Sequence, residues 1–426
     1  MNLYPHQIEE LNATEDRNRV AYYHDMGLGK TFVGAEKLVR LGSKLNLVVC
    51  QKSKIDDWYD HFMKYYFDNF LIFDLTDEGH FKSFFSYQEE ENYFERIGII
   101  NYDLVFRRPE LKQLEDFTLL LDESSLIQNE QAKRSKFILN LKPKNVILLS
   151  GTPTGGKYER LWSQMKLLGW NISKTMFYDH YVNYHYDDSN GFPLMIIDGY
   201  KNEERLKRKM RQYGCRFLKT DEVFDLPNQV DQKIYIPSSK EYRIFKDDSI
   251  ITLNDDNVEL VGNTVLTKLL YERQLCGQYS KEKLSAFKDL IESTEDRLIV
   301  FYNFNEEWHK LGKIVDAIDR PSSVVNGQFK DLSALKKENG ILFIQYQAGS
   351  MGLNLQMANR IIYFTPPLSS ELFEQSKKRI HRINQTRPCF YYLLTCKGSV
   401  EERIYKTLAE RRNYTNALFE METIQR

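Results

Sequence analysis

The residues with the clearest chemical potential form the stretch DMGLGKT, residues 25–31. It follows a strand-like run and opens a helix-like run, at 20–23 and 32–41. A strand, a glycine-rich loop and a helix that begins at Lys-Thr are typical of a phosphate-binding loop. Gly27 and Gly29 have no Cβ, so backbone N–H groups can crowd around phosphate oxygens at a helix N-terminus. Lys30 would reach the β- and γ-phosphates, and the Thr31 hydroxyl would hold magnesium.

Two adjacent carboxylates, Asp122 and Glu123, follow the apolar run at 117–121. Carboxylates at the end of a buried strand are costly unless they have partners or a chemical role. In phosphoryl transfer the first would hold magnesium through water, and the second would orient the attacking water. The alternative is an ordinary turn at the end of a strand, which the phosphate-binding loop upstream makes less favoured.

Alternating strand and helix patterns predict an α/β fold with parallel sheets and ligands at the carboxyl ends of the strands. Gly27, Asp122 and Thr152 all follow such ends. The second half repeats the alternation, and the segment at 158–219 is mostly helical in pattern. The predicted strands lie at 20–23, 45–50, 71–73, 97–100, 117–121 and 145–150, then at 298–302, 323–325, 341–344, 361–364 and 390–394. The predicted division is a first lobe at 1–222, a linker at 223–240 and a second lobe at 241–426.

Composition excludes several classes of protein. The chain has 426 residues, 28% of them charged, and a net charge of −1, so any nucleic-acid surface must be local. Its five cysteines form no C-x-x-C pair, which favours free thiols over a disulfide framework or a zinc site. The sequence shows no secretory signal and no apolar run of membrane length. We therefore expect a cytoplasmic protein with no membrane partner.

The order of these motifs resembles the Swi/Snf family of DNA translocases, within helicase superfamily two, over almost the whole chain. In the first half the matching stretches are LYPHQ, DMGLGKT, LVVCQKS, IINYD, LLLDESSLIQN and ILLSGTP. In the second half they are RLIVFYNF, GSMGLNLQMANRIIYF and QSKKRIHRINQ, with FLKTDEVFDLPNQ and RQLCGQ between the two sets. The resemblance implies two RecA-like lobes, each a mainly parallel sheet flanked by helices, with a helical insertion between their motifs.

The resemblance also implies roles for individual residues, with ATP and Mg²⁺ as cofactors. Lys30, Asp122, Glu123, Arg379 and Arg382 would be catalytic, and Thr31 and Asp122 would hold Mg²⁺ through water. ATP would be bound by Gln7, Met26, Gly27, Leu28, Gly29, Lys30, Thr31, Gly352 and Gln375. Asn101, Ser150, Thr152 and Asn354 would couple the site to DNA, and Gly349, Gly352 and Asn354 would lie at the lobe interface.

Three second-lobe residues of the implied site, Gln375, Arg379 and Arg382, fall in the segment at 370–383, which has a helical pattern. In one continuous helix, Gln375, Arg379 and Arg382 would share a face, because they are four and three residues apart. A guanidinium suits phosphate recognition because it stays charged and its planar fork matches phosphate oxygens. The alternative is that Glu371 and Glu374 pair with these arginines on a solvated surface.

Three residues depart from the family pattern: His24 where a small residue is usual, Asp25 where Glu is common, and Asn384 in INQ where IGQ is common. None of them removes a charged catalytic group, so we expect a DNA-dependent ATPase that moves along double-stranded DNA. The alternatives are a strand-separating helicase, a nucleotide switch without hydrolysis, and the motor subunit of a restriction or repair complex. Replication, repair or restriction proteins are then the expected protein partners, in the cytoplasm of a bacterial or phage-infected cell.

Overall fold

The computed structural model describes residues 2–86, 95–188, 193–253, 258–348 and 353–419, and side-chain surroundings as far as residue 411. The chain divides into two compact units. The first is Met1–Val223 together with Asn413–Arg426, and the second is Phe224–Arg412. Within the described ranges, no helix combines the length and the apolarity that crossing a bilayer requires.

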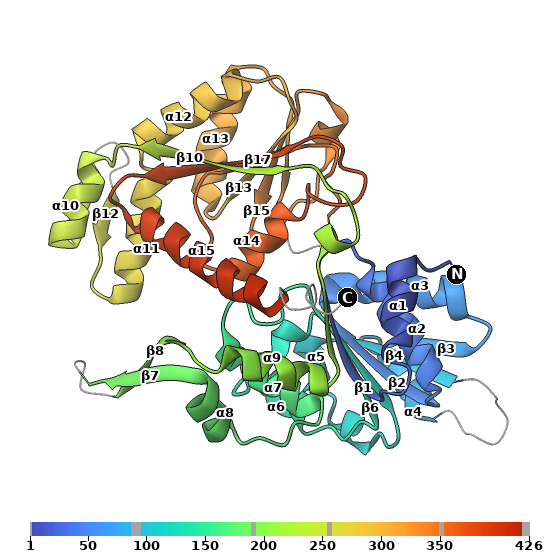
Figure 1. The fold of residues 1–426 in the computed structure, drawn as a ribbon. Helices are drawn as coiled ribbons and strands as arrows, with labels where there is room; N and C mark the ends of the chain where they lie inside the picture. The colour runs from blue at the N-terminus through green and yellow to red at the C-terminus, as the bar shows by residue number, and fades with distance from the viewer. Residues whose placement is uncertain (1, 87–94, 189–192, 254–257, 349–352, 420–426) are drawn as a thin grey trace. The chain divides into compact units, whose positions relative to one another are not determined.

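The first unit is built on a seven-stranded sheet in the order β3-β4-β2-β5-β6-β1-β9, and all neighbouring pairs are parallel (Figure 1). Six of its strands confirm predictions made from apolar runs. The strands are β1 (Arg19–His24), β2 (Leu45–Cys50), β3 (Phe70–Asp74), β4 (Glu95–Asn101), β5 (Thr118–Asp122), β6 (Asn145–Leu149) and β9 (Cys215–Leu218).

Both faces of this sheet are buried, as a parallel sheet requires. Along β1, Val20 and Tyr22 enter one apolar cluster, and Ala21 and Tyr23 enter another. The first cluster includes residues of α1 (Pro5–Asn12), α2 (Lys30–Leu41) and α3 (Ile55–Tyr66). The second includes residues of α4 (Glu78–Ser86), α5 (Tyr102–Val105), α6 (Lys133–Leu139), α7 (Trp162–Leu167), α8 (Lys174–Tyr181) and α9 (Glu203–Gln212).

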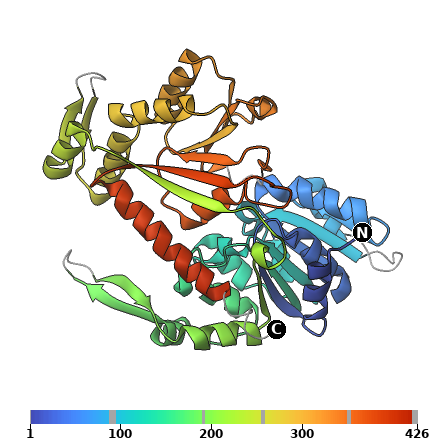
Figure 2. The ribbon, with the colours of Figure 1, turned by 45° about the horizontal axis from the view of Figure 1, so that its top comes forward.

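The prediction that residues 158–219 are mostly helical is partly wrong. The helices α7, α8 and α9 are present, but β7 (Val182–Asp187) and β8 (Leu194–Tyr200) form an antiparallel hairpin between the last two. Alternating aromatic residues such as Tyr184 and Tyr186 favour a strand. The hairpin projects from the sheet of its unit in both views (Figure 1, Figure 2).

The second unit carries a six-stranded parallel sheet in the order β10-β17-β16-β13-β15-β14. Its five predicted strands are confirmed. The edge strand β10 (Gln229–Ile236) falls within the predicted linker at 223–240, where the sequence indicates a short extended segment but no strand of the sheet. Most of its side chains are exposed, so it lacks an apolar run. The strands confirmed are β13 (Leu298–Tyr302), β14 (Ser322–Val325), β15 (Ile341–Gln345), β16 (Arg360–Tyr363) and β17 (Cys389–Cys396).

Helices cover both faces of this second sheet. The apolar cluster on one face includes residues of α12 (Lys281–Glu292) and α13 (Asn305–Ala317). The cluster on the other face includes residues of α10 (Lys240–Asp248), α11 (Val265–Cys276), α14 (Ser370–Lys377) and α15 (Val400–Phe419). The sequence predicts a helix over 258–277, but β12 (Val258–Val261) pairs there with β11 (Ile250–Leu253), and the helix begins only at Val265.

Candidate active site

The glycine loop between β1 and α2 has the backbone shape that its sequence predicts. Gly27 and Gly29 have φ values of 92° and 73°, in the left-handed region that side chains disfavour. A Cβ on Gly29 would lie 2.3 Å from Nε2 of Gln7. No side chain caps the N-terminus of α2. The amide groups of this turn are therefore available to an anion, since helix N-termini attract negative charge.

Lys30 stands at the start of α2 and is held by neutral groups. Its Nζ donates to the carbonyl oxygens of His24, at 2.9 Å, and Asp25, at 3.3 Å. A Cβ on Gly151 would lie 3.3 Å from the same Nζ, so the loop after β6 passes directly beside Lys30. Since neither carbonyl neutralises the ammonium, its charge is left to act on phosphate.

Asp122 is the last residue of β5, two strands from β1 in the sheet. Its Oδ2 accepts a hydrogen bond of 2.9 Å from Nε1 of Trp58. Burial raises the pKa of this carboxyl group, while the Trp58 hydrogen bond and the charge of Lys30 oppose that shift. Trp58 fixes the carboxylate from α3. Sequence analysis missed Trp58, because its distance from Asp122 in the chain hides the contact.

Glu123 and Ser150 connect the acidic pair to the loop after β6. Ser150 Oγ donates to Oε2 of Glu123 at 3.4 Å and accepts from the backbone N–H of Thr152 at 3.1 Å. Glu123 has a φ of 54°, a left-handed conformation that is strained for a residue with a side chain. Asn101 is 7% exposed at the N-terminus of α5. The structure thus brings Lys30, Asp122, Glu123 and Ser150 to one edge of the sheet.

A buried glutamine, Gln164 on α7, joins three segments of this edge. Its Oε1 accepts from the hydroxyls of Tyr23, at 2.9 Å, and Ser124, at 2.8 Å. Its Nε2 donates to the carbonyl oxygen of Pro153 at 2.7 Å. Sequence analysis missed it. No motif marks it, because α7 (WSQMKL), which follows the SGTP loop at 150–153, mixes polar and apolar residues and its burial shows only in the structure.

Gln7 lies against the glycine loop, as the sequence predicts. It is 3% exposed; its Nε2 donates to the carbonyl oxygen of Leu28 at 3.1 Å, and its Oε1 accepts from the N–H of Tyr4 at 2.9 Å. Each polar atom can make one further hydrogen bond. This leaves a donor and an acceptor for an adenine edge, and that contact stays a prediction.

The unusual His24 is accommodated by a buried ionic cluster. Its Nε2 lies 3.2 Å from Oε2 of Glu10 on α1, and Arg216 on β9 binds both oxygens of the same carboxylate. Burial alone would raise the pKa of Glu10, but its hydrogen bonds with His24 and Arg216 lower it to about 2. The larger side chain at position 24 therefore ties the start of the glycine loop to α1 and β9.

The side chain of Asp25 is held by Thr220, in the segment that follows β9. Its Oδ2 accepts from both the N–H and the hydroxyl of Thr220, each at 3.3 Å. The Thr220 hydroxyl also lies 3.3 Å from the carbonyl oxygen of Met26. Thr220 thus explains why FLKTDEV, a stretch outside the obvious motifs, belongs to the site. Thr31 follows Lys30 in the first turn of α2.

In the second unit, the prediction of one helix over 370–383 is wrong. The helix α14 ends at Lys377, and the chain continues through turns, so Arg379 and Arg382 do not share a helical face with Gln375. Arg379 is 5% exposed, and burial lowers the pKa of Arg382. After Lys377 the backbone N–H groups bond within tight turns, such as that of Arg379 to the carbonyl of Ser376, and the Arg379 carbonyl accepts from the N–H of Leu355 in a distant segment.

Gln385 and Asn384 explain the end of this segment. Nε2 of Gln385 lies 3.1, 3.0 and 3.2 Å from the carbonyl oxygens of Gln356, Ala358 and Ile380, which joins the loop before β16 to the turn after α14. Asn384 has a φ of 74°. Asparagine tolerates the left-handed region better than most residues with side chains, so INQ can replace the more common IGQ.

Of the remaining predicted residues of the second unit, the structure describes Asn354, in the segment before β16. Asn354 is exposed, and its Oδ1 lies 3.5 Å from the N–H of Gln356. Gly349 and Gly352 lie outside the described residues. Their assigned roles at ATP and at the lobe interface stay predictions.

Comparisons with family models give two matches along the chain. The model described as "SNF2-related domain" matches residues 15–281, more than half of the chain, and the model described as "Helicase conserved C-terminal domain" matches residues 282–384. The two models meet inside the second unit. Together they include all the candidate residues named above except Gln7, Glu10 and Gln385.

Curated relatives are similar at low identity. YwqA of Bacillus subtilis (strain 168), named as an ATP-dependent helicase/translocase, is 25% identical over 346 residues, which covers 74% of this chain and 37% of the relative. YqhH of the same organism, named as an ATP-dependent helicase, is 22% identical over 96% of this chain and 78% of its own length. The chain spans between 37% and 43% of the first three relatives.

Among solved structures, the Sulfolobus solfataricus SWI2/SNF2 ATPase core in complex with dsDNA aligns with 99% of this chain and 94% of its own. The sequence identity is 21% and the TM-score is 0.47.

Proposed function

Because the chain belongs to the family of SNF2-related domains, we propose that it is a DNA-dependent ATPase that couples ATP hydrolysis to movement along double-stranded DNA. The family membership confirms the resemblance that the sequence motifs indicate. One observation of the structure carries the ATPase part of the proposal. A glycine loop, a lysine held by neutral carbonyls and two carboxylates meet at the carboxyl edge of one parallel sheet.

The residues of this edge fit the parts of a nucleoside triphosphate and its magnesium ion. The open backbone at Gly27 and Gly29 and the ammonium of Lys30 suit the phosphates. The oxygen ligands of Thr31 and Asp122 suit Mg²⁺, held partly through water, and the ion would neutralise charge on the phosphates. Glu123 is proposed to orient the attacking water.

Ser150 and Gly151 connect hydrolysis to the rest of the first unit. Ser150 contacts Glu123, and Gly151 lies beside Lys30, so a change at the γ-phosphate reaches the SGTP loop through two contacts. We propose that Thr152, Asn101 and, in the second unit, Asn354 pass this change to DNA. Gln375, Arg379 and Arg382 are proposed to act on ATP from the second unit, with both arginines supplying positive charge to the γ-phosphate.

The name of YwqA, an ATP-dependent helicase/translocase, supports ATP-driven action on a nucleic acid. The bacterial origin of YwqA and YqhH supports action in a bacterial or phage-infected cell. Replication, repair or restriction proteins remain the predicted partners.

Triplex displacement tests the proposed function against its rival, the strand-separating helicase. A third strand bound to a duplex is displaced by a protein that moves along that duplex, and the duplex itself need not open. We expect ATP-dependent release of the third strand and little unwinding of a plain duplex. Efficient unwinding without triplex displacement would favour the helicase.

A further inference from the structure

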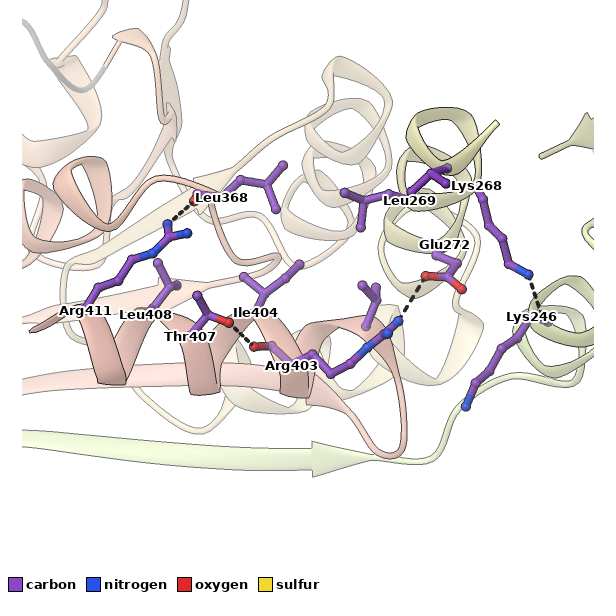
Figure 3. A pocket seen from close by; sticks show the side chains of 12 residues that line it. Lys246, Lys268, Leu269, Glu272, Leu368, Arg403, Ile404, Thr407, Leu408 and Arg411 are labelled. Carbon is purple, nitrogen blue, oxygen red and sulfur yellow. Dashed lines mark hydrogen bonds and ion pairs between the residues drawn. The ribbon is translucent and has the colours of Figure 1, made fainter. Parts of the chain in front are cut away.

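A cavity of about 580 Å³ opens on the second unit between α11 and α15 (Figure 3). Its volume falls within the roughly 300–1,000 Å³ that is usual for ligand sites. Six apolar side chains line it. They are Val265 and Leu269 of α11, Leu368, and Val400, Ile404 and Leu408 of α15. We call this site the α11–α15 groove.

The floor of the groove is the edge of the unit's apolar core, and exposed apolar residues, Val265 and Leu368 among them, stand at its rim. Val400, Ile404 and Leu408 are spaced by four residues and therefore lie along one face of α15, where they are 3%, 8% and 2% exposed. Val265 is 89% exposed and its neighbour Leu266 is 76% exposed. Adjacent large apolar side chains at this exposure, beside an apolar floor, are typical of an interaction surface.

Basic residues surround this apolar floor. Lys246, Lys268, Arg403 and Arg411 line the groove with a single acidic residue, Glu272, which is buried and lies 3.5 Å from Arg403. Lys268 Nζ donates to the carbonyl oxygen of Lys246 at 2.9 Å and to Oγ of Ser249 at 2.8 Å, both neutral groups. Four cations against one anion leave the lining positive.

We propose that the α11–α15 groove binds an acidic amphipathic helix of a protein partner. Apolar side chains one turn apart on that helix would pack against the exposed Val265 and Leu368, above the floor that α15 forms. Flanking carboxylates would meet Lys246, Lys268 and Arg403. Successive turns of any α-helix are about 5.4 Å apart, so a helix lying along α15 repeats the spacing of Val400, Ile404 and Leu408 in that floor.

The chemistry of the lining favours a protein helix over nucleic acid. Phosphate groups would find cations at the rim, but a phosphodiester backbone has no apolar side to place on the leucine and isoleucine floor. An amphipathic acidic helix satisfies both parts of the lining at once. The groove lies within Phe224–Arg412, so the inference goes beyond ATP hydrolysis and does not depend on it.

A displayed library of 16-residue helices tests the proposal on the full chain. The library fixes Leu, Ile or Phe at positions one turn apart and allows Glu, Asp, Lys, Gln or Ser at the flanking positions. Binders selected on the parent protein are then measured by fluorescence anisotropy against two variants, Val265→Asp and Lys246→Glu. The matched control is Lys313→Glu, an exposed lysine on α13.

Acidic flanking residues should be enriched, and each groove variant should weaken binding by about tenfold or more. Val265→Asp should not disturb folding, because position 265 is exposed and Asp is favourable in the first turn of a helix. The control should bind as the parent does, and added salt should weaken binding. Enrichment of basic flanking residues, no enrichment, or binding that neither groove variant affects would overturn the proposal.

Two further results would assign the groove to another occupant and also overturn the proposal. The first is self-association of the parent that Val265→Asp abolishes in sedimentation, which would indicate a second copy of this chain. The second is a loss of duplex DNA affinity in Lys246→Glu while no displayed helix binds the parent.

Discussion

The two units repeat one local arrangement, a buried parallel strand followed by a loop and a helix, with opposite outcomes at the helix N-terminus. In the first unit β1 leads to α2 through Gly27 and Gly29, and no side chain caps the helix. In the second unit β13 leads to α13, whose Glu307 accepts hydrogen bonds from the N–H groups of Asn303, at 2.8 Å, and Phe304, at 3.1 Å.

In the second unit the carboxyl group of Glu307 takes up the N–H groups that precede α13. The side chain is fully buried, its Oε2 also accepts from the Thr365 hydroxyl at 3.0 Å, and burial raises its pKa to about 7. A Cβ on Gly277 would lie 2.2 Å from Oε1, so the carboxyl group is closely enclosed. The comparison teaches that the N–H groups before α13 already have a side-chain partner, whereas no side chain caps α2 and its N-terminus stays open to an anion.

The largest effect that this comparison predicts is at Lys30. Lys30→Ala removes the charge beside the open N-terminus and should abolish ATP hydrolysis while the fold, measured by circular dichroism, is kept. Lys313→Ala, on the corresponding helix of the second unit, is the control and should hydrolyse ATP as the parent does. Turnover near the parent rate in Lys30→Ala would contradict the assignment of the phosphate-binding loop.

The next largest effect concerns the arginines of the second unit. Arg382→Ala should cut DNA-stimulated turnover by orders of magnitude, and Arg379→Ala by a smaller factor, since an arginine that stabilises the transferring phosphate is worth about a thousandfold or more. ATP binding, measured with a fluorescent analogue, should change far less. Lysine should restore little activity at either position, because it keeps the charge and loses the planar fork.

If both alanine variants turn over at the parent rate with DNA present, the second unit does not supply the charge on the γ-phosphate. The γ-phosphate would then need a source of positive charge other than these arginines, in addition to Lys30 beside the glycine loop of the first unit.

A smaller effect is predicted for Gln164. Gln164→Met keeps the side-chain size and removes the bonds to Tyr23, Ser124 and Pro153, each worth about 1 kcal/mol. Because these bonds position the acidic pair and the SGTP loop, DNA-stimulated kcat should fall by about tenfold while the KM for ATP stays near the parent value. Tyr23→Phe, which removes one of the bonds, should have a smaller effect.

An unchanged DNA-stimulated kcat in Gln164→Met would show that the glutamine supports packing alone. A parallel fall in thermal stability and in activity without DNA would point the same way. Only a selective loss of the DNA-stimulated rate supports a positioning role.

The smallest effect is on stability and comes from Glu307. Its folded-state pKa, about 7, lies above the ordinary glutamate value of 4.5, so its stabilising contribution is full below about pH 4.5 and is lost as the pH rises through 7. Glu307→Gln keeps a hydrogen-bond acceptor without the charge. At pH 8 its free energy of unfolding, measured with urea, should exceed that of the parent by about 1–3 kcal/mol. The difference should shrink toward pH 5. A difference that does not change with pH would contradict the burial of an ionisable group here.

Much of the first unit's site could be predicted from sequence because its strands are short apolar runs that end at charged or glycine residues. Asp122 and Ser150 stand directly at the end of such a run, Lys30 follows one after the glycine loop, and the parallel sheet brings these strand ends together. Gln164, Trp58 and Thr220 could not be predicted in the same way. Their contacts cross between segments that are far apart in the chain, and none of them carries a recognisable motif.

The second unit was harder to predict at its edges. β10 pairs along its whole length with β17 but exposes most of its side chains, so pairing rather than an apolar pattern defines it. The turn after α14 reads as helix in sequence, yet Gln385 and the left-handed Asn384 bind it to the loop before β16. In both cases contacts between distant segments outweigh the local pattern.

The most direct test of the central claim is the ATPase rate of the parent protein measured in parallel without nucleic acid and with duplex DNA, single-stranded DNA and RNA. The account predicts the strongest stimulation with duplex DNA, and a stimulation that declines as salt rises, because contacts to the DNA backbone release counterions. Stimulation by RNA without stimulation by DNA would contradict the account.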